Sequence, residues 1–447
     1  IRLAAPTGKA AARLTESISQ QVRTLDVADA VRERIPCDVT TVHRLLGSRP
    51  GTRHFRHHGG NRLPLDLLVV DEASMIDLEM MANLLDALPP HARLVLLGDK
   101  DQLASVEAGA VLGDLCRDAE DGWYSPRTRA WLESVSGENL AASDLQQDLD
   151  GSHPLAQQVV MLRHSRRFGE GSGIGQMARQ VNQQQPEKAR QSLVGGQYAD
   201  LFSLALTGEH DGKLERLALE GHAGGPQGYR HYLNVLRERR PAPDRPLADS
   251  CWADWARDVL SAFDAFQLLC AVRKGPWGVD GLNQRVTTAL LKARLIESDH
   301  QWYEGRPVLM TRNDYGLGLM NGDIGIALKL PERAGPDAGK QVLRVAFLRN
   351  DGEGGVRFVL PSRLNDVETV YAMTVHKSQG SEFTHTALIL PDALNPVLTK
   401  ELVYTAITRA KQWFSLIEPR AGIFEEAVRR KVKRLSGLML ELERETD

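Results

Sequence analysis

The sequence predicts an α/β protein in which parallel sheets are covered by helices. Two observations support this fold class. Several apolar runs of strand length are apolar on both faces and end in polar or glycine-rich turns, and stretches with helical periodicity follow them, such as 10–19 and 77–87. Ligands of such sheets lie at the carboxyl ends of the strands, so the polar residues found there are the first candidates for a site.

Three strands of this kind are predicted in the N-terminal part, and each delivers polar groups at its end. They are residues 2–5, followed by Pro6-Thr7-Gly8-Lys9; residues 67–70, followed by Asp71-Glu72; and residues 94–97, followed by Gly98-Asp99. We therefore expect these polar groups to lie along one edge of one sheet.

The remainder of the chain is predicted to contain a second sheet with an insertion. Residues 117–155 are polar and lack periodicity, which is typical of a linker, and 184–260 carries helical stretches broken by glycine and proline. Strand signals of the second sheet lie at 266–272, 386–390 and 413–417. Between them, short β-rich pieces in 305–367 alternate with Gly- and Asn-rich turns, as in a small barrel inserted into the second α/β domain.

Composition excludes several classes of protein. With 447 residues, 42% hydrophobic and 25% charged, the chain is an ordinary globular protein of more than one domain, and its apolar runs are too short to cross a membrane. Four cysteines without a Cys-x-x-Cys pattern exclude a disulfide scaffold and a thiolate zinc site, and favour a reducing cytoplasm. The first residue is Ile1, not Met, so we expect the sequence to be the later part of a longer protein.

A basic segment stands out in a chain whose net charge is −3. No Asp or Glu occurs between Asp38 and Asp66, whereas five arginines and four histidines do: Arg44, Arg49, Arg53, Arg56, Arg62, His43, His54, His57 and His58. An arginine cluster without carboxylates attracts polyanions, so we predict phosphate contacts here, a solvated loop being the alternative. A histidine metal site is not expected, because no carboxylate lies nearby.

Asp71-Glu72, directly after an apolar strand, has the pattern of a Walker B motif. The first carboxylate of such a pair holds Mg²⁺ and the second orients or deprotonates the water that attacks a phosphate. Gln102 lies beyond the next strand, where its amide can sense a γ-phosphate. The alternatives are a strand that ends in two solvated acids and a turn that caps a helix.

Five segments together resemble the motifs of superfamily-one helicases. Their amino-acid sequences are similar to those of the RecD family, the 5′→3′ helicase subunits of RecBCD helicase–nucleases. The segments are Pro6–Ala11 (motif Ia), Asp71–Ser74 (motif II), Gly98–Val106 (motif III), Thr374–Phe383 (motif V) and Tyr404–Ala410 (motif VI). Thr41–Gly47, Gly275–Val279 and Asn321–Gly325 agree with this family. The resemblance covers most of 1–116, 159–178, 263–328 and 361–417, and five motifs in the right order do not arise by chance.

The resemblance implies roles for the matching positions. Asp71, Glu72, Gln102, Arg167 and Arg409 are the implied catalytic residues for ATP hydrolysis, with Asp71 and Glu72 also at Mg²⁺. Gly380, Glu382 and Arg166 are implied to contact the nucleotide, Glu382 at its ribose. The implied contacts to single-stranded DNA are Pro6, Thr7, Lys9, Thr41, Thr374, His376, Lys377 and Ser378, joined by the basic-segment residues His43, Arg53 and Arg56. Each implied arginine finger has the alternative of a surface ion pair.

Two departures from the family pattern affect the expected chemistry. No Gly-x-x-x-x-Gly-Lys-Ser/Thr occurs in the sequence, so nothing in it cradles the phosphates, and we expect the family's P-loop to precede Ile1. Arg166 stands where related helicases often carry a tyrosine that stacks on adenine. An arginine can also stack, so adenine selectivity stays open.

We therefore predict two RecA-like α/β domains with ATP between them: domain 1 over 1–155, with a small basic insertion near 43–65 that is expected to form a strand-separating pin, and domain 2 over 156–447, interrupted by the insertion at 305–367. The implied protein is an ATP-dependent DNA helicase with RecB-type and RecC-type partners in double-strand break repair. The alternatives are a stand-alone RecD-type helicase and a non-catalytic DNA-binding or assembly subunit whose ATPase has decayed.

Overall fold

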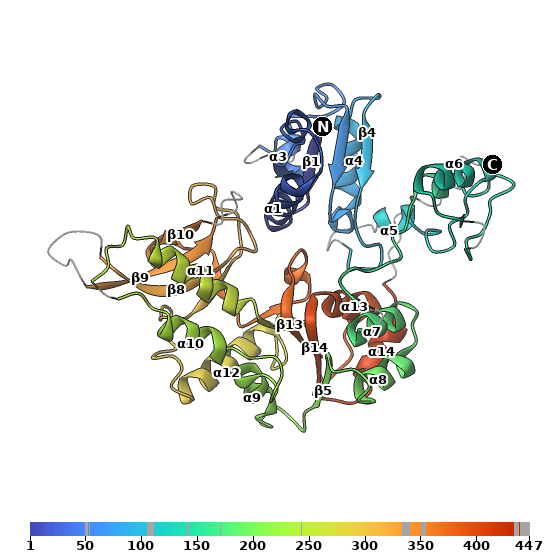
Figure 1. Cartoon of the computed structure of the whole chain (residues 1–447). Coiled ribbons are helices and arrows are strands. Elements are labelled where there is room, and N and C mark those ends of the chain that lie inside the picture. Colours follow the sequence, from blue (N-terminus) through green and yellow to red (C-terminus); the bar gives the residue numbers. More distant parts are fainter. Residues whose placement is uncertain are drawn as a thin grey trace. The chain divides into compact units, whose positions relative to one another are not determined.

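The computed structural model describes residues 1–49, 52, 54–104, 111–140, 143–169, 171–242, 244–332, 340–349, 355–432 and 438. By their internal contacts these residues form two compact units (Figure 1). Unit 1 comprises 1–6, 42–169 and 433–447, and unit 2 comprises 7–41 and 170–432. Each unit is described by itself below.

Unit 1 contains a parallel sheet with helices. Its elements are β1 (Arg2–Ala5), α3 (Val42–Leu46), β3 (Leu67–Val70), the 3₁₀ helix η1 (Ala73–Met75), α4 (Leu78–Ala87), β4 (Arg93–Leu96), α5 (Val111–Leu115), α6 (Pro126–Ser136) and the 3₁₀ helix η3 (Leu155–Gln158). β3 pairs in parallel with β1 on one side and with β4 on the other, with Ala4 and Leu96 opposite Val70. The three predicted strands therefore exist, in the predicted orientation.

Local sequence explains the helix that follows β3. Asp77 caps α4, because its side chain accepts a hydrogen bond from the backbone N–H of Met80 at 2.8 Å. Leu84 of α4 is fully buried and packs in the same core as Leu68 of β3. The apolar stripe of the helix thus covers one face of the sheet and holds the end of β3 in place.

Unit 2 contains a five-stranded parallel sheet in the order β12-β6-β13-β14-β5. Its parallel strands are β5 (Leu201–Ala205), β6 (Phe266–Cys270), β12 (Ala372–Thr374), β13 (Phe383–Ile389) and β14 (Ala410–Glu418). Its helices are α1 (Gly8–Thr24), α2 (Asp29–Arg32), α7 (Gly173–Asn182), α8 (Pro186–Val194), α9 (Lys213–Glu220), α10 (Arg230–Glu238), α11 (Cys251–Phe263), α12 (Val279–Lys292), η5 (His376–Ser378), α13 (Lys400–Thr408) and α14 (Ile423–Arg429), and β2 (Val39–Thr41) also groups here. The strand β5 was not predicted, because 184–260 shows mostly helical periodicity.

The β insertion is confirmed. β7 (Pro307–Met310), β8 (Ile324–Pro331), β9 (Gln341–Leu348), β10 (Val356–Val359) and β11 (Val367–Thr369) pair antiparallel in the order β10-β9-β8-β7-β11. Val308, Phe347 and neighbouring apolar side chains form its own core. In the described residues β10 and β11 are the edges, so the insertion is an open sheet rather than a closed barrel.

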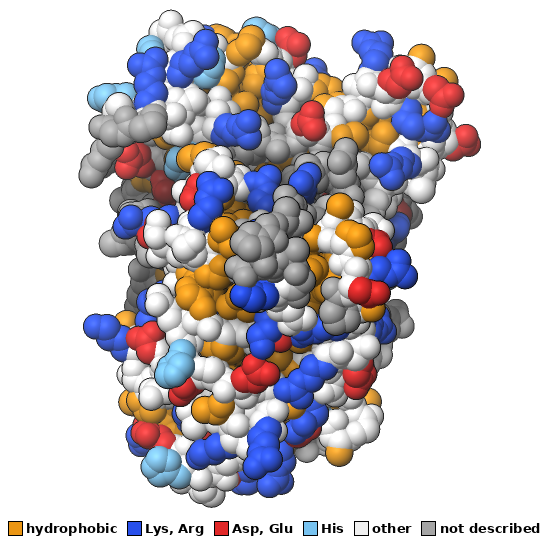
Figure 2. Space-filling view, turned by 90° about the vertical axis from the view of Figure 1, so that its left-hand side faces the viewer, with side chains coloured by type: hydrophobic (Ala, Val, Ile, Leu, Met, Phe, Trp, Pro, Cys, Tyr) orange, Lys and Arg blue, Asp and Glu red, His pale blue; other side chains and the backbone are white. Residues whose placement is uncertain are grey.

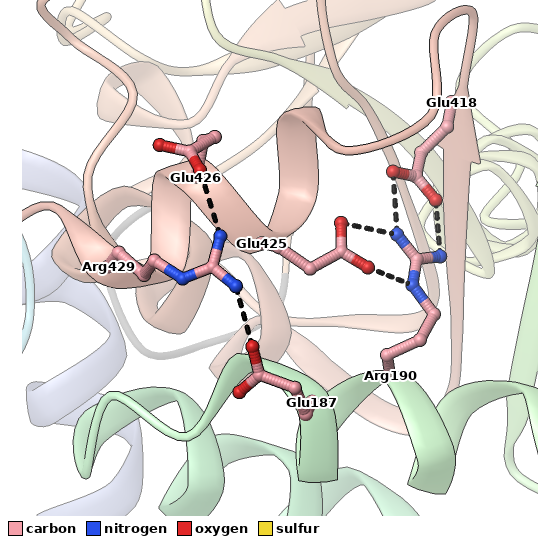
Figure 3. A network of polar contacts seen from close by, with 6 residues as sticks. All are labelled: Glu187, Arg190, Glu418, Glu425, Glu426 and Arg429. Carbon is pink, nitrogen blue, oxygen red and sulfur yellow. Dashed lines mark hydrogen bonds and ion pairs between the residues drawn. The ribbon is translucent and has the colours of Figure 1, made fainter.

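An ion-pair network fastens the C-terminal helix of unit 2 (Figure 3). The guanidinium of Arg190 on α8 donates to Glu425 of α14 at 2.7 Å and to Glu418 at the end of β14 at 2.8 Å. Hydrogen bonds from Arg190 hold the pKa of the Glu425 carboxyl below its ordinary value. Arg429 forms a more exposed pair with Glu187 in the same view. The network ties α8 to β14 and α14, whose glutamates lie 228 and 235 residues after Arg190 in the sequence.

Two observations bear on where the predicted domains divide. The hydroxyl of Tyr124 donates to the carbonyl of Val159 at 2.9 Å, and Arg163 donates to the carbonyl of Ala119 at 3.1 Å, so 156–169 groups with unit 1. The boundary predicted between 155 and 156 remains a prediction.

Among the described residues, no helix combines the length and the hydropathy that a membrane crossing requires.

Candidate nucleotide and nucleic-acid sites

Asp71 and Glu72 leave the end of β3 on a tight turn. The backbone N–H of Asp71 donates to Ala4 of β1 at 3.0 Å, and that of Leu97 donates to Val70 at 2.8 Å, so the pair emerges between two neighbouring strands. Glu72 has a left-handed backbone with φ 52°, and its N–H donates to the Asp71 carboxylate at 2.9 Å. A non-glycine residue in this conformation carries backbone strain, which the surrounding fold sustains at this edge.

Gly98 brings the loop after β4 against the same turn. A Cβ at this position would lie 2.8 Å from Leu112 and 3.1 Å from the backbone nitrogen of Ala73, so only glycine fits without displacement. In the loop, the amide of Gln102 donates to the Asp99 carboxylate at 3.1 Å. The carboxyl ends of β3 and β4 are adjacent in the sheet, so the turn with Asp71 and Glu72 and the loop with Gln102 follow strands that end at the same edge. The roles of the three side chains stay predictions.

The residues at this edge fit a magnesium ion. Mg²⁺ binds oxygen ligands, keeps several waters and requires only one or two carboxylates, which Asp71 and Glu72 supply. The hydroxyl of Ser74 is buried in η1 and has no hydrogen-bond partner in the described residues, so a polar group is available beside the pair. No group of three or more His, Cys, Asp or Glu side chains suitable for a metal occurs in the described part of the chain.

Arg166 and Arg167 lie in an exposed segment after η3. The guanidinium of Arg167 lies over the ring of Phe168, 5.7 Å from its centre. Both arginines group with unit 1 by their contacts, whereas the sequence placed them in the second domain. Their roles at the nucleotide stay predictions.

The basic segment near 43–65, named the basic loop below, begins within α3 and continues as a short hairpin. Ser48 pairs antiparallel with Phe55, and the backbone N–H of Arg56 donates to Gly47 at 3.0 Å. Gly47 is required, because its φ is +72° and a Cβ would lie 2.7 Å from that of Arg56. The buried side chains of Leu46 and Leu63 anchor the hairpin in the core of unit 1.

The basic side chains of this loop lie at the surface. The exposed ones include His43, Arg49, Arg56 and Arg62, and the ring of His43 meets Phe55 edge-on at 6.1 Å. Arg53 lies outside the described residues. Figure 2 shows a face of the molecule on which Lys, Arg and His side chains gather at the upper left. The predicted phosphate contacts would be made by side chains that already point into solvent.

In unit 2, the N-terminal turn of α1 carries the predicted motif Ia residues. The hydroxyl of Thr7 caps the helix by accepting from Ala10 at 3.2 Å. Burial lowers the pKa of the half-buried Lys9, and the carboxylates of Asp264 and Asp323 partly offset this. Thr7 thus serves the helix through its hydroxyl, and Lys9 faces carboxylates in the structure.

Motif V follows β12 and forms the 3₁₀ helix η5. Thr374 ends the strand, and its hydroxyl accepts from the backbone N–H of Lys377 at 3.3 Å. The ammonium of Lys377 donates to Asn321 of the β insertion at 3.0 Å. His376 is half-buried, whereas Ser378 is fully buried and donates to Val375 at 2.7 Å. Lys377 and His376 therefore face outward more than Ser378 does.

Motifs V and VI are joined inside unit 2. Arg409 at the end of α13 is 3% exposed, and its guanidinium donates to the carbonyls of Ser381 and Thr405, each at 3.2 Å. Gly380 has φ +71°, and a Cβ there would lie 3.6 Å from that of Ala10. The structure thus brings together Ser381 and Arg409, and Gly380 and the start of α1. The roles of these residues stay predictions.

Sequence reasoning gave no role to three side chains that act on predicted site residues. Arg13 of α1 forms an ion pair of 2.5 Å with Glu382, and Asn321 accepts a hydrogen bond from Lys377. The charge of Asp323 raises the pKa of Lys9 and so opposes the effect of burial. Arg13 could have been found, since it lies four residues after Lys9 and thus on the same face of the helix. Asn321 and Asp323 lie in the segment Asn321–Gly325, which the resemblance singled out without giving either residue a role.

Two protein-family models match parts of the chain. An AAA domain matches residues 1–108, and a UvrD-like helicase C-terminal domain matches residues 369–417. The first match contains the β3 and β4 edge of unit 1, and the second contains motifs V and VI of unit 2. The two matched regions contain most of the candidate residues, whereas Arg166 and Arg167 lie outside them.

Individual proteins with similar sequences identify the family more closely than the two domain matches do. The chain is 38% identical to the RecBCD enzyme subunit RecD of Haemophilus influenzae over 98% of its length, and 39% identical to that of Mycolicibacterium smegmatis over 96%. It is also 28% identical to the ATP-dependent RecD2 DNA helicase of Deinococcus radiodurans. The chain is thus a relative of RecD, which confirms the resemblance inferred from the motifs. It spans 64% of the length of the first two relatives.

Among solved structures, Pif1 from Bacteroides bound to single-stranded DNA aligns with 100% of this chain and 93% of its own, at 15% identity. The TM-score is 0.41, so this superposition does not by itself establish a common fold. The fold class rests instead on the parallel strand pairing of both units and on the antiparallel insertion.

Proposed function

We propose that the complete protein is an ATP-dependent 5′→3′ DNA helicase, a subunit of a RecBCD-type helicase–nuclease in double-strand break repair and recombination. The supporting observation is the similarity to RecD subunits over 98% of the chain. The proposal names ATP and Mg²⁺ as cofactors, single-stranded and duplex-end DNA as substrates, RecB-type and RecC-type subunits as partners, and the cytoplasm as location.

The edge of the unit 1 sheet supplies the hydrolytic groups in this proposal. Asp71 and Glu72 would hold Mg²⁺, which neutralises charge on the phosphates when bound. The Glu72 carboxylate orients the attacking water and takes its proton, and the Gln102 amide donates to the γ-phosphate. Arg166 and Arg167 are proposed to contact the nucleotide, Arg167 at the γ-phosphate.

The residues of unit 2 link nucleotide and DNA. Arg409 is proposed to donate to the γ-phosphate, which requires its guanidinium to leave the carbonyls of Ser381 and Thr405. Because Ser381 is part of motif V, that change would alter the segment which holds the DNA backbone through Thr374 and His376. Hydrolysis and grip on the strand are thereby coupled through one side chain.

A polypeptide of residues 1–447 alone is proposed to hydrolyse ATP slowly. It contains no Gly-x-x-x-x-Gly-Lys-Ser/Thr sequence, so no backbone nest holds the β- and γ-phosphates. DNA-stimulated hydrolysis by residues 1–447 at ordinary helicase rates would contradict this.

A substitution in the full-length gene product tests the enzymatic proposal. Glu72→Gln keeps the shape of the side chain but removes its basicity, so DNA-stimulated ATP hydrolysis should fall by roughly 10²–10⁴-fold. Glu79→Gln, on the exposed face of α4, is the matched control and should retain wild-type turnover. A Glu72→Gln enzyme with more than about a tenth of the activity would overturn the assignment, and a wild-type protein without ATPase would favour the non-catalytic alternative.

A stand-alone RecD-type helicase is the second candidate, supported by the similarity to the Deinococcus radiodurans helicase. Gel filtration of the full-length protein with RecB-type and RecC-type subunits from its own organism separates the two. Co-elution supports a RecBCD-type subunit, and an unwinding protein that stays monomeric beside them supports the stand-alone helicase.

A further inference from the structure

The loop that joins β7 to β8 holds an exposed tyrosine on a rigid support. Asp314 and Leu319 exchange two backbone hydrogen bonds of 2.7 and 2.9 Å, which closes the loop into a hairpin. Leu317 and Leu319 are 7% and 1% exposed and belong to the core of the insertion. Tyr315 is 72% exposed. The two leucines anchor the loop, so the aromatic ring stays in solvent without disturbing the core.

A chain of hydrogen bonds leads from this tyrosine to motif V. The Asn313 amide donates to the Tyr315 hydroxyl at 3.3 Å, and the backbone N–H of Asn321 donates to the Asn313 side chain at 2.8 Å. The Asn321 side chain in turn accepts from the Lys377 ammonium at 3.0 Å. An aromatic ring, two amides and a cation therefore form one continuous surface.

The charge of this surface favours a polyanion. Arg312 is exposed, and the Arg357 guanidinium lies so near Gly318 that a Cβ there would be 2.4 Å from it. The neighbouring carboxylates are engaged within the fold, since Asp314 accepts from Leu317 at 2.9 Å and Asp323 accepts from the backbone N–H of residue 320 at 2.8 Å.

We propose that Tyr315 is a base-stacking platform for single-stranded DNA and that Lys377 contacts a phosphate of the same strand. Aromatic rings stack on any base, while cations follow the backbone, which is the combination that binds single strands without sequence preference. Asn313 and Asn321 are positioning residues, because their hydrogen bonds hold the Tyr315 ring and the Lys377 ammonium at fixed positions relative to each other. The inference rests on the proposed function and makes the β insertion part of its DNA-binding surface.

The first test measures binding of a fluorescent oligo(dT) to residues 1–447 by anisotropy over a range of salt concentrations. Stacking of one base on an aromatic ring contributes roughly 5- to 150-fold in affinity, so Tyr315→Ala should weaken binding by that factor. Tyr315→Phe keeps the ring and should stay within about 2-fold of wild type. The salt slope of Tyr315→Ala should be unchanged, whereas Lys377→Ala should flatten it by about 0.7.

The second test identifies the stacked base. One abasic nucleotide is moved along the oligonucleotide, and the position that weakens the wild-type complex most should have no effect on Tyr315→Ala, because the ring and the base act together. Asn321→Ala tests the positioning role. It should flatten the salt slope as Lys377→Ala does, since Lys377 loses its acceptor.

A matched control and the melting curves separate the outcomes. Trp131→Ala removes an aromatic side chain that is 61% exposed on α6 and should leave binding unchanged. If wild type binds the strand and Tyr315→Ala binds equally well with the same abasic profile, the stacking site is overturned while the helicase proposal stands. If wild type binds no single strand, the stacking site is overturned, while the helicase proposal is decided by the ATPase of the full-length protein.

Discussion

In the basic loop of unit 1, Arg49, Arg56 and Arg62 are exposed, and the sequence from 39 to 65 contains no Asp or Glu. In unit 2, Arg190 lies between the carboxylates of Glu418 and Glu425 (Figure 3). Residues of the same type are thus presented to solvent in one region and neutralised within the fold in the other.

The difference indicates what each set of charges does. A charge paired inside the fold stabilises it only as long as both partners remain, because a lone buried partner keeps its desolvation cost. An exposed arginine contributes little to stability and is available to a phosphate. Substitution of Arg190 should therefore change stability, and substitutions in the basic loop should change DNA binding.

Arg409 should give the largest effect, and it tests whether a buried arginine of unit 2 can also act on a ligand. In the full-length protein, Arg409→Ala should lower DNA-stimulated ATP turnover by roughly 10³-fold or more, as loss of an arginine finger does. Its stability should fall by about 1–3 kcal/mol, because two carbonyls lose their donor. Steady-state ATPase and a melting curve measure both.

Arg409→Lys keeps the charge but not the planar fork of donors, so it should not restore the rate. An Arg409→Ala protein that is folded and keeps more than about a tenth of the turnover, a loss under about 1.4 kcal/mol, would show that Arg409 is structural alone, like Arg190.

Arg190 should give the next effect. Arg190→Ala leaves the carboxylate of Glu418, whose side chain is 7% exposed, without its cationic partner. The substitution should lower the free energy of unfolding by about 3 kcal/mol. Arg429→Ala breaks the more exposed pairs with Glu187 and Glu426 and should leave the free energy of unfolding close to the wild-type value. Urea unfolding of both variants measures the contrast, and equal losses would refute it.

A buried histidine extends the comparison to pH. His385 is fully buried, and its ring nitrogen lies 2.8 Å from the Ser415 hydroxyl, which also contacts His222 at 2.9 Å. Burial lowers the pKa of His385 from 6.5 to about 3. The unfolded chain therefore takes up a proton below pH 6.5 that the folded chain does not, so stability is complete above that pH and falls as the pH decreases toward 3.

At pH 5 the loss from His385 should be about 2 kcal/mol relative to pH 7.5, from about 1.4 kcal/mol per pH unit. His385→Asn should flatten this dependence of the unfolding midpoint on pH. His54→Asn, exposed in the basic loop, is the control and should leave it unchanged. A parallel pH profile for wild type and His385→Asn would mean that another group carries the dependence.

The smallest effect is expected in the basic loop. Replacing Arg56 and Arg62 by Ala should weaken binding of single-stranded DNA by roughly 5-fold per lost phosphate contact at 0.1 M salt and flatten the salt slope by about 0.7 each. The melting temperature should stay at the wild-type value. An unchanged salt slope would assign this segment to a solvated loop.

Much of the fold could be predicted because it depends on local patterns. The runs 2–5, 67–70 and 94–97 are apolar on both faces, which only a covered parallel strand accommodates, and all three are strands. β5 was missed, since it is a short edge strand among helical stretches. The insertion was recognised from its turns, but the open order of its strands depends on pairing between distant segments.

The sequence by itself determined which residues follow the strands β1, β3 and β4 and that the chain is similar to RecD subunits. Strand periodicity and the residues of each motif are carried by neighbouring positions in the chain. Only the tertiary structure decided that Arg409 is buried against Ser381, that Arg13 pairs with Glu382, and that Asn321 holds Lys377. These contacts join residues far apart in the chain, and their free energy depends on burial and distance, which no local pattern encodes.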